Sequence, residues 1–113
     1  MMRTLSLLLL LLFTAVIPVA AQDEVTELDQ MTVELWPDYD RPAMLVLLTG
    51  TLPATATLPA TVSIPLPDDA DIFAIARLTD EDVLVSDVES TAADGRLTLT
   101  TPGRTFRVEY YAP

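Results

Sequence analysis

Short runs in which apolar and polar residues alternate with a period of two recur along most of the chain. Clear examples are residues 31–36, 96–101 and 105–111. Alternation of this kind places every second side chain on the same face of a β-strand. Gly, Pro and Asp interrupt the runs about every eight to twelve residues, which is typical of a β-sandwich or barrel. No stretch of about 11 residues or more has the 3.6-residue apolar period of a helix, so a helical bundle is excluded.

The individual runs predict how the strands are placed. Residues 43–48 are continuously apolar, which predicts a central strand that is buried on both sides. Residues 61–66 predict an edge strand, because Pro65 has no N–H to give to a neighbouring strand. Residues 71–78 fit a strand or a short helix, and their β-branched and aromatic residues favour the strand. In the alternating runs, the side chains expected to point into the core are Met31, Val33, Leu35, Leu97, Leu99, Phe106, Val108 and Tyr110. The side chain of Tyr111 is expected to point outward.

These elements add up to about seven strands. Residues 96–101 and 105–111 are expected to pair as a hairpin across a turn at Pro102 and Gly103. We therefore predict an all-β domain over residues 30–113, with an immunoglobulin-like or fibronectin-like β-sandwich fold. It lacks the Cys pair of antibody domains, as fibronectin-type modules also do.

The first 21 residues have the layout of a secretory signal peptide. Arg3 supplies a positive charge, residues 7–17 form an apolar segment, and residues 19–21 offer small side chains before a cleavage site. The alternative is an uncleaved membrane anchor, but the apolar stretch is at the short end of the ~17–25 residues that span a bilayer. Residues 22–29 are polar and acidic and predict a flexible leader. The expected location is therefore secreted or extracytoplasmic, in the cell envelope.

The composition closes off many activities. The chain has no Cys, His, Lys or Asn, and its six Arg stand against 17 acidic residues, for a net charge of −11. Disulfides, Cys or His metal centres, Cys or His catalysts and a Lys Schiff base are excluded. Nucleic-acid binding is not expected, since basic charge to neutralise phosphates is lacking. A pair of carboxylates across a cleft remains as a catalytic device, but a small sandwich rarely encloses one. We therefore predict no catalytic residues, no cofactor and no enzyme activity.

The segment with the most varied chemistry is residues 36–42. It contains the only tryptophan of the chain and is framed by two prolines. Aromatic rings beside carboxylates can stack on a sugar and bond its hydroxyls, which makes this a candidate ligand-binding loop. The alternative is structural: Trp36 plugs one end of the sandwich and Tyr39 bonds a backbone carbonyl. In that alternative Arg41 pairs with Asp38 or Asp40. The candidate binding residues are Trp36, Asp38, Tyr39, Asp40 and Arg41.

Acidic clusters offer a second, weaker kind of site. Oxygen-rich loops suit Ca²⁺, which takes six to eight oxygen ligands. No cluster has the spacing of an EF-hand loop, but two clusters at one end of a sandwich would supply enough oxygens. The alternative is that these aspartates initiate turns and keep the surface soluble. The residues that could contribute to such a calcium site are Asp68, Asp69, Asp71, Asp80 and Asp82. They are weak candidates only, and the prediction is that the protein has no metal site.

Two short segments, residues 34–42 and residues 109–111, carry a resemblance to known proteins. The run Glu34-Leu35-Trp36-Pro37-Asp38-Tyr39-Asp40-Arg41-Pro42 and the ending Glu109-Tyr110-Tyr111 are similar to the "ELWPxYDxP … EYY" pattern of uncharacterised exported β-sandwich proteins. The resemblance implies a β-sandwich module that stands ahead of further domains or a membrane anchor. Ala112 and Pro113 directly follow the last predicted strand. Under this resemblance, the chain is either a fragment of a longer anchored protein or a single-domain relative without the anchor.

The expected function follows from these features together. We expect a non-catalytic, exported module that binds a protein or glycan at the bacterial cell envelope. The alternative is a carbohydrate-binding or Ca²⁺-dependent adhesion domain. Contact with a membrane is expected only through the export signal or a C-terminal anchor.

Overall fold

Nine β-strands and no helix make up the part of the chain that the structure, a computed structural model, describes, which is residues 23–113. The strands are β1 (Asp23–Val25), β2 (Gln30–Pro37), β3 (Met44–Thr51), β4 (Ala60–Pro65), β5 (Asp71–Leu78), β6 (Leu84–Val85), β7 (Glu89–Ala93), β8 (Arg96–Thr101) and β9 (Thr105–Ala112). The predicted signal peptide, residues 1–21, lies outside the described residues. No helix that could cross a bilayer occurs among residues 23–113.

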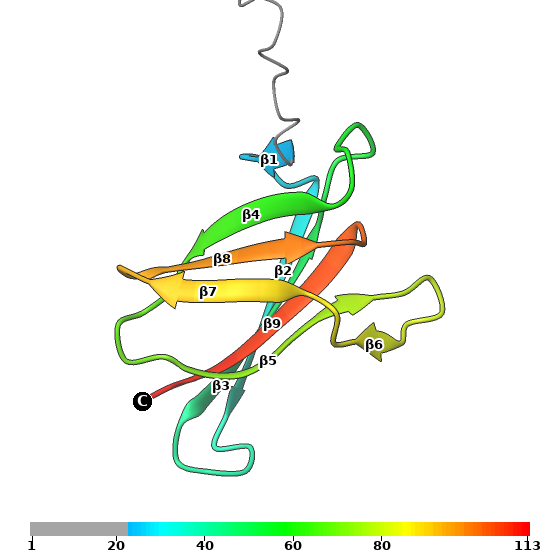
Figure 1. Cartoon of the computed structure of the whole chain (residues 1–113). Helices are drawn as coiled ribbons and strands as arrows, with labels where there is room; N and C mark the ends of the chain where they lie inside the picture. Colours follow the sequence, from blue (N-terminus) through cyan, green and yellow to red (C-terminus); the bar gives the residue numbers. More distant parts are fainter. Residues whose placement is uncertain (1–22) are drawn as a thin grey trace, which may run out of the picture.

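The strands form two sheets (Figure 1). One sheet has the order β1-β4-β8-β7 and the other the order β2-β3-β9-β5-β6. All neighbours are antiparallel except β1 and β4, which run parallel. The expectation of a β-sandwich is confirmed, with nine strands in place of about seven. The additional strands are β1, which lies inside the segment predicted to be a flexible leader, and the exposed strand β7.

The core between the sheets is built mainly from residues that the alternation predicted. Leu97 and Leu99 of β8 and Phe106 and Val108 of β9 are at most 1% exposed. Val46 and Tyr110 complete this layer on the five-stranded sheet. The prediction for residues 43–48 is confirmed too, because β3 is buried on both faces between β2 and β9. The strand prediction for residues 71–78 is also confirmed, as β5.

Two expectations about strand pairing are corrected. Residues 96–101 and 105–111 do not form a hairpin, because β8 belongs to one sheet and β9 to the other, and the intervening turn carries the chain across the sandwich. The hairpin is instead β7–β8, with Asp94 at φ 54° and Gly95 at φ 73° in its turn. Two positive φ values in succession are what a two-residue type I′ hairpin turn requires.

The predicted edge strand at residues 61–66 is also mostly covered. β4 lies between β8 and the short strand β1, which pairs with Ala60, Thr61 and Val62 only. The remaining end of β4, which carries Pro65, has no neighbour on that side among the described strands. The proline therefore occupies a position where a missing N–H costs no ladder hydrogen bond.

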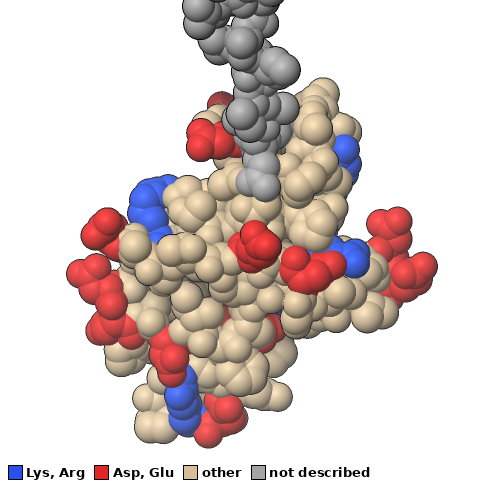
Figure 2. Space-filling model, viewed as in Figure 1, with Lys and Arg blue, Asp and Glu red and all other residues tan. Residues whose placement is uncertain are grey.

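The surface is strongly acidic, as the composition implies. Figure 2 shows Asp and Glu side chains in separate patches on the visible face, mainly around its margin, with few arginines among them. Two ion pairs occur in the described residues, Arg41 with Asp71 and Arg77 with Asp87. Most of the acidic side chains therefore stand in solvent without a basic partner.

Candidate functional site

The predicted binding loop joins β2 to β3 as a tight, internally bonded turn. Asp38 adopts a positive φ of 49° directly after Pro37. Its N–H donates to the carbonyl of Ala43 at 3.2 Å, and the N–H of Ala43 donates to the carbonyl of Arg41 at 2.7 Å. Aspartate is one of the residues that tolerate a left-handed conformation. The two backbone hydrogen bonds give the loop a defined shape.

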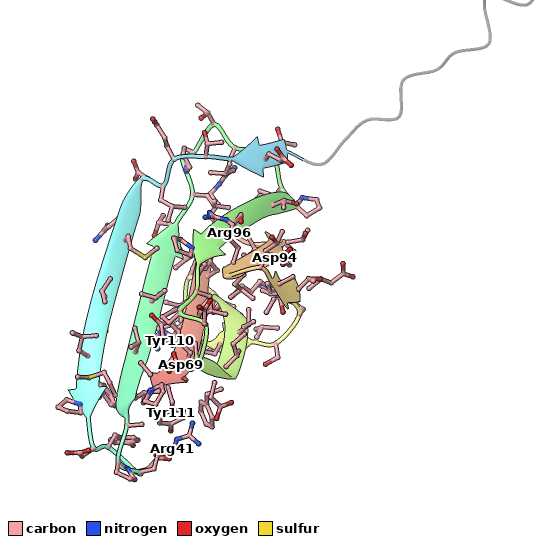
Figure 3. The ribbon with its side chains drawn as sticks, turned by 90° about the vertical axis from the view of Figure 1, so that its left-hand side faces the viewer. Arg41, Asp69, Asp94, Arg96, Tyr110 and Tyr111 are labelled. Atoms are coloured by element: carbon pink, nitrogen blue, oxygen red, sulfur yellow. The ribbon has the colours of Figure 1, made fainter. Side chains whose placement is uncertain are left out.

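Tyr111 on β9 anchors the loop, and Figure 3 shows it next to Arg41. Its hydroxyl donates a 2.7 Å hydrogen bond to Oδ1 of Asp40, and the guanidinium carbon of Arg41 lies 3.4 Å from the centroid of its ring. Arg41 also donates from its terminal Nη2 to Oδ2 of Asp71 on β5 at 2.8 Å. Tyr111 does lie on the outer face of the five-stranded sheet, as predicted, but the residue is only 5% exposed. It packs on Leu45 under the loop.

Trp36 and Tyr39 lie on the solvent-facing side of the loop that Tyr111 holds. Their ring centroids are 5.1 Å apart in an edge-to-face arrangement, and the two residues are 40% and 63% exposed. Trp36 therefore does not plug the end of the sandwich, which was the structural alternative. The other part of that alternative, the pairing of Arg41 with Asp38 or Asp40, is not found either, since Arg41 pairs with Asp71.

A β-bulge adds a third exposed ring that the sequence did not single out. Ile72 pairs with Tyr110 and Ala74 with Glu109, so Phe73 is the extra residue of the bulge. Bulges redirect side chains, and here Phe73 is 64% exposed with its ring edge-to-face against Tyr111 at 5.8 Å. Trp36 and Tyr111 are both registered with Leu45, so their backbones are about 10 Å apart, which is two strand spacings.

The hydroxyl of Tyr111 has an altered proton affinity. The hydrogen bond to Asp40, the burial of the ring and the negative charge of Asp40 raise its pKa above the usual tyrosine value, and Arg41 opposes this. A raised pKa in the folded state means that the protonated tyrosine stabilises the fold. This stabilisation is complete below the unfolded value of about 10 and is lost as the pH rises through the folded pKa.

Replacing Tyr111 by phenylalanine should remove that alkaline contribution. The free energy of unfolding of the wild-type protein should fall more steeply with pH above about pH 10 than that of Tyr111→Phe. Denaturant unfolding followed by circular dichroism at a series of pH values measures both curves. Between about pH 7 and pH 9 the curves should run parallel. Parallel curves above pH 10 as well would show that the bond to Asp40 contributes nothing.

The calcium candidates are divided by the fold. Asp68, Asp69 and Asp71 lie before or at the start of β5, whereas Asp80 and Asp82 lie after its end. The eight residues of β5 separate the two groups by about 25 Å, and Asp71 is already paired with Arg41. Within residues 23–113, no three carboxylates come together as a cation site needs.

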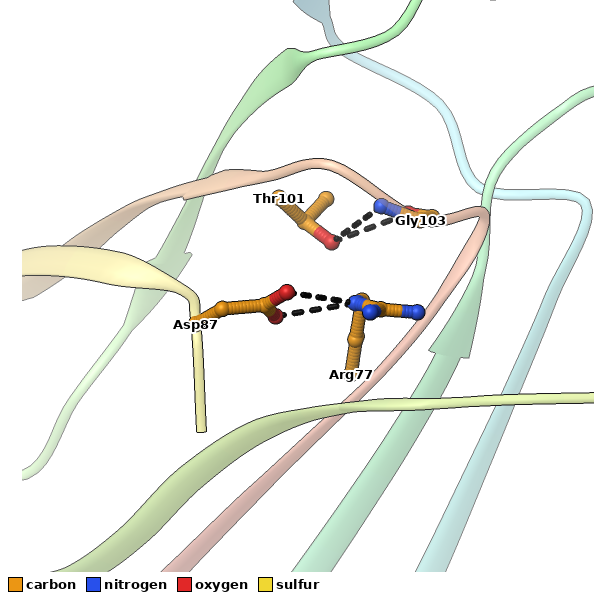
Figure 4. A network of polar contacts seen from close by, with 4 residues as sticks. All are labelled: Arg77, Asp87, Thr101 and Gly103. Carbon is orange, nitrogen blue, oxygen red and sulfur yellow. Dashed lines mark hydrogen bonds and ion pairs between the residues drawn. The ribbon is translucent and has the colours of Figure 1, made fainter. Parts of the chain in front are cut away.

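The far end of β5 carries a different polar network, which is structural (Figure 4). Nε of Arg77 donates to both carboxylate oxygens of Asp87 at 2.8 and 2.9 Å. Beside it, the Thr101 hydroxyl donates to the carbonyl of Gly103 at 2.9 Å and accepts from its N–H at 3.2 Å. These bonds hold the turn that carries the chain from β8 to β9, and nothing in them resembles a catalytic arrangement.

The candidate site is therefore an outward-facing aromatic surface at one end of the five-stranded sheet, made by Trp36, Tyr39, Asp40, Arg41, Phe73 and Tyr111. The structure brings together four of the five predicted binding residues with Phe73, Asp71 and Tyr111. Asp38 serves the shape of the loop. No family model matches the chain, and no curated protein and no solved structure is significantly similar to it.

Proposed function

We propose that this protein is an exported, non-catalytic β-sandwich module that binds a protein or glycan at the bacterial cell envelope. The contact surface is the Trp36–Tyr39 pair on the loop between β2 and β3. Export rests on the signal-peptide layout of residues 1–21. The non-catalytic role rests on a composition without Cys, His or Lys.

The observation that carries the proposal is the exposure of two large aromatic rings on a loop with a defined shape. Burying an aromatic side chain in a partner yields much of the binding energy at many interfaces. The loop is held by the bonds of Asp40 and Arg41 to Tyr111 and Asp71. Binding therefore costs little additional ordering of the backbone, and such preorganisation increases affinity.

A glycan is the ligand that the geometry favours within this class. The exposed faces of Trp36 and Tyr39 can stack on the apolar face of a sugar ring. Oδ1 of Asp40 accepts a hydrogen bond from the Tyr111 hydroxyl. A carboxylate has further acceptor sites, which can accept hydrogen bonds from sugar hydroxyls. A calcium-dependent mode has less support, because the acidic clusters lie at opposite ends of β5.

Titration with cell-envelope polysaccharides tests the proposal directly, because Trp36 is the only tryptophan. Its intrinsic fluorescence reports on this loop alone. We expect a binding glycan to change the emission maximum or intensity in a saturable manner. We expect Trp36→Ala and Tyr39→Ala each to weaken binding, measured by isothermal titration calorimetry, by about tenfold or more.

The matched control is Val83→Ala, which removes a similarly exposed apolar side chain in the loop between β5 and β6. It should bind as the wild type does. A glycan that binds without altering Trp36 fluorescence, or equally well to Trp36→Ala, would contradict this assignment of the binding surface. A melting temperature that does not change at millimolar Ca²⁺ would remove the calcium-dependent alternative.

A further inference from the structure

The outer strand β2 has free backbone hydrogen-bonding groups along one edge. β2 ends the five-stranded sheet, with β3 as its only neighbour among the described strands. Asp38 and Ala43 are opposite each other and are hydrogen bonded, and the register continues without a shift to Gln30 and Thr51. Because bonded pairs alternate in an antiparallel ladder, the even-numbered residues of β2 bond to β3. The odd-numbered residues direct their N–H and C=O groups away from the sheet.

The same odd-numbered residues present apolar side chains to solvent. Met31, Val33 and Leu35 were expected to be buried, and they do share the core face of the sheet opposite Gly50, Leu48 and Val46. That expectation of burial is wrong: they are 39%, 54% and 57% exposed. The four-stranded sheet does not reach this far, and Figure 3 shows β2 at the margin of the molecule beside β3. Free main-chain groups and uncovered apolar side chains therefore belong to the same three residues.

β2 also lacks the devices that commonly protect an edge strand. Short length, a bulge, a lysine or a central proline usually prevents further pairing. β2 has eight residues in regular register and no basic residue, and its proline stands only at the last position. The other edge strands of the described sheets are β1 with three residues, β6 with two, and β7, whose sequence is ESTAA. β5 is covered by β6 only at Arg77 and Leu78, but the bulge at Phe73 interrupts its open edge. β2 is the long apolar edge among them.

The charges around β2 decide what can occupy this edge. Glu27 and Asp29 precede the strand, Asp38 and Asp40 follow it, and all four are exposed. In an antiparallel pair of two β2 strands, the acidic end of one copy would lie against the acidic end of the other. A parallel pair would also bring like charges together, and like charges placed opposite each other are destabilising. A second copy of this chain is therefore disfavoured, and a strand with basic ends is favoured.

We propose that β2 binds, by strand addition, an extended segment of a partner protein that has apolar residues at alternate positions and Lys or Arg at both ends. The main-chain groups of Met31, Val33 and Leu35 would continue the sheet onto this segment. Their side chains would cover its apolar face, as in other cases of β-strand addition. The surface differs from the Trp36–Tyr39 surface, because Trp36 is an even-numbered residue on the opposite face of the sheet.

A fluorescent peptide of alternating Val and Thr with Lys residues at each end tests the proposal. Fluorescence anisotropy with the purified protein should show saturable binding that weakens with salt, and a peptide with Glu at its ends should not bind. Val33→Lys should weaken binding by about tenfold or more, because it places a charge on the apolar strip beside the basic peptide. Val33→Pro should do the same by removing one free N–H without breaking the bonds to β3.

Val83→Lys is the matched control, since Val83 is also 54% exposed but lies between β5 and β6. It should bind the peptide as the wild type does, and circular dichroism should show that Val33→Lys is folded. Equal binding by Val33→Lys and Val83→Lys would overturn the proposal. So would a dimer in sedimentation experiments that Val33→Lys dissociates, because the occupant of the edge would then be a second copy.

Discussion

Replacement of Phe106 by alanine is expected to lower the free energy of unfolding by about 3–5 kcal/mol. Phe106 is fully buried near the start of β9, so the substitution removes apolar contacts and leaves a cavity between the sheets. Domains of this kind have a total stability of about 5–15 kcal/mol, and no disulfide supplements the core of this one. The variant should therefore unfold at a much lower denaturant concentration. Urea unfolding followed by far-ultraviolet circular dichroism measures the difference.

Phe73→Ala is the matched control for this experiment. Phe73 is 64% exposed, and its aromatic contact is the edge-to-face pair with Tyr111. Its removal should cost only about 0.5–1.5 kcal/mol, the usual value of an aromatic pair. Similar losses for the two variants would mean that the layer between the sheets is not the main source of stability.

Substitution of Gly50 by alanine is expected to destabilise the fold by about 1–3 kcal/mol through overpacking. A Cβ atom at Gly50 would lie 2.5 Å from Cζ and 2.8 Å from Cε1 of Phe106. Gly50 is opposite Phe106 in the pairing of β3 with β9, so the ring covers the glycine. Because Phe106 is enclosed by the core, the ring has little room to move. The cost should appear as a lower midpoint of urea unfolding.

A double-mutant cycle identifies the cause of that cost. Phe106→Leu alone should destabilise, but it also removes the ring that an alanine at position 50 would meet. The free energy of unfolding lost in the double variant should therefore be smaller than the sum of the losses in the two single variants. The difference, the coupling energy, should be about 0.5–3 kcal/mol. Gly103→Ala is the control, since its Cβ would meet Cδ of Arg77 at 3.0 Å and not Phe106, so its loss should add to that of Phe106→Leu. Additive losses at Gly50 and Phe106 would show that the ring is not what requires glycine.

Much of the strand pattern was predictable because the direction of a side chain along a strand is a local property. Successive side chains point to opposite faces, so alternation alone placed Leu97, Leu99, Phe106 and Val108 in the core. The buried strand β3 was predictable for a similar reason, since a continuous apolar run needs cover on both faces. The hairpin expected across Pro102 and Gly103 was not correct, because a turn sequence alone does not decide whether two strands pair or diverge to opposite sheets.

The site was predictable as a segment but not as an arrangement. Residues 36–42 were selected from their chemistry, yet their partners come from distant parts of the chain. Tyr111, 71 residues after Asp40, bonds to it, and Asp71, 30 residues after Arg41, pairs with it. These contacts arise only because β9 lies between β3 and β5. Phe73 was not predicted, because its outward position depends on a bulge in the register of β5 against β9.

The sequence by itself determined that the chain forms β-strands, which residues share a face, and which chemistries are closed to it. Backbone geometry and side-chain composition settle these properties within a few residues. The tertiary structure decided which faces are covered and which strand is left at an edge. Met31, Val33 and Leu35 have the same alternation as Leu97 and Leu99, but the four-stranded sheet stops short of β2 and leaves them exposed. Burial needs a second element opposite the face, and the position of that element depends on contacts distant in the sequence.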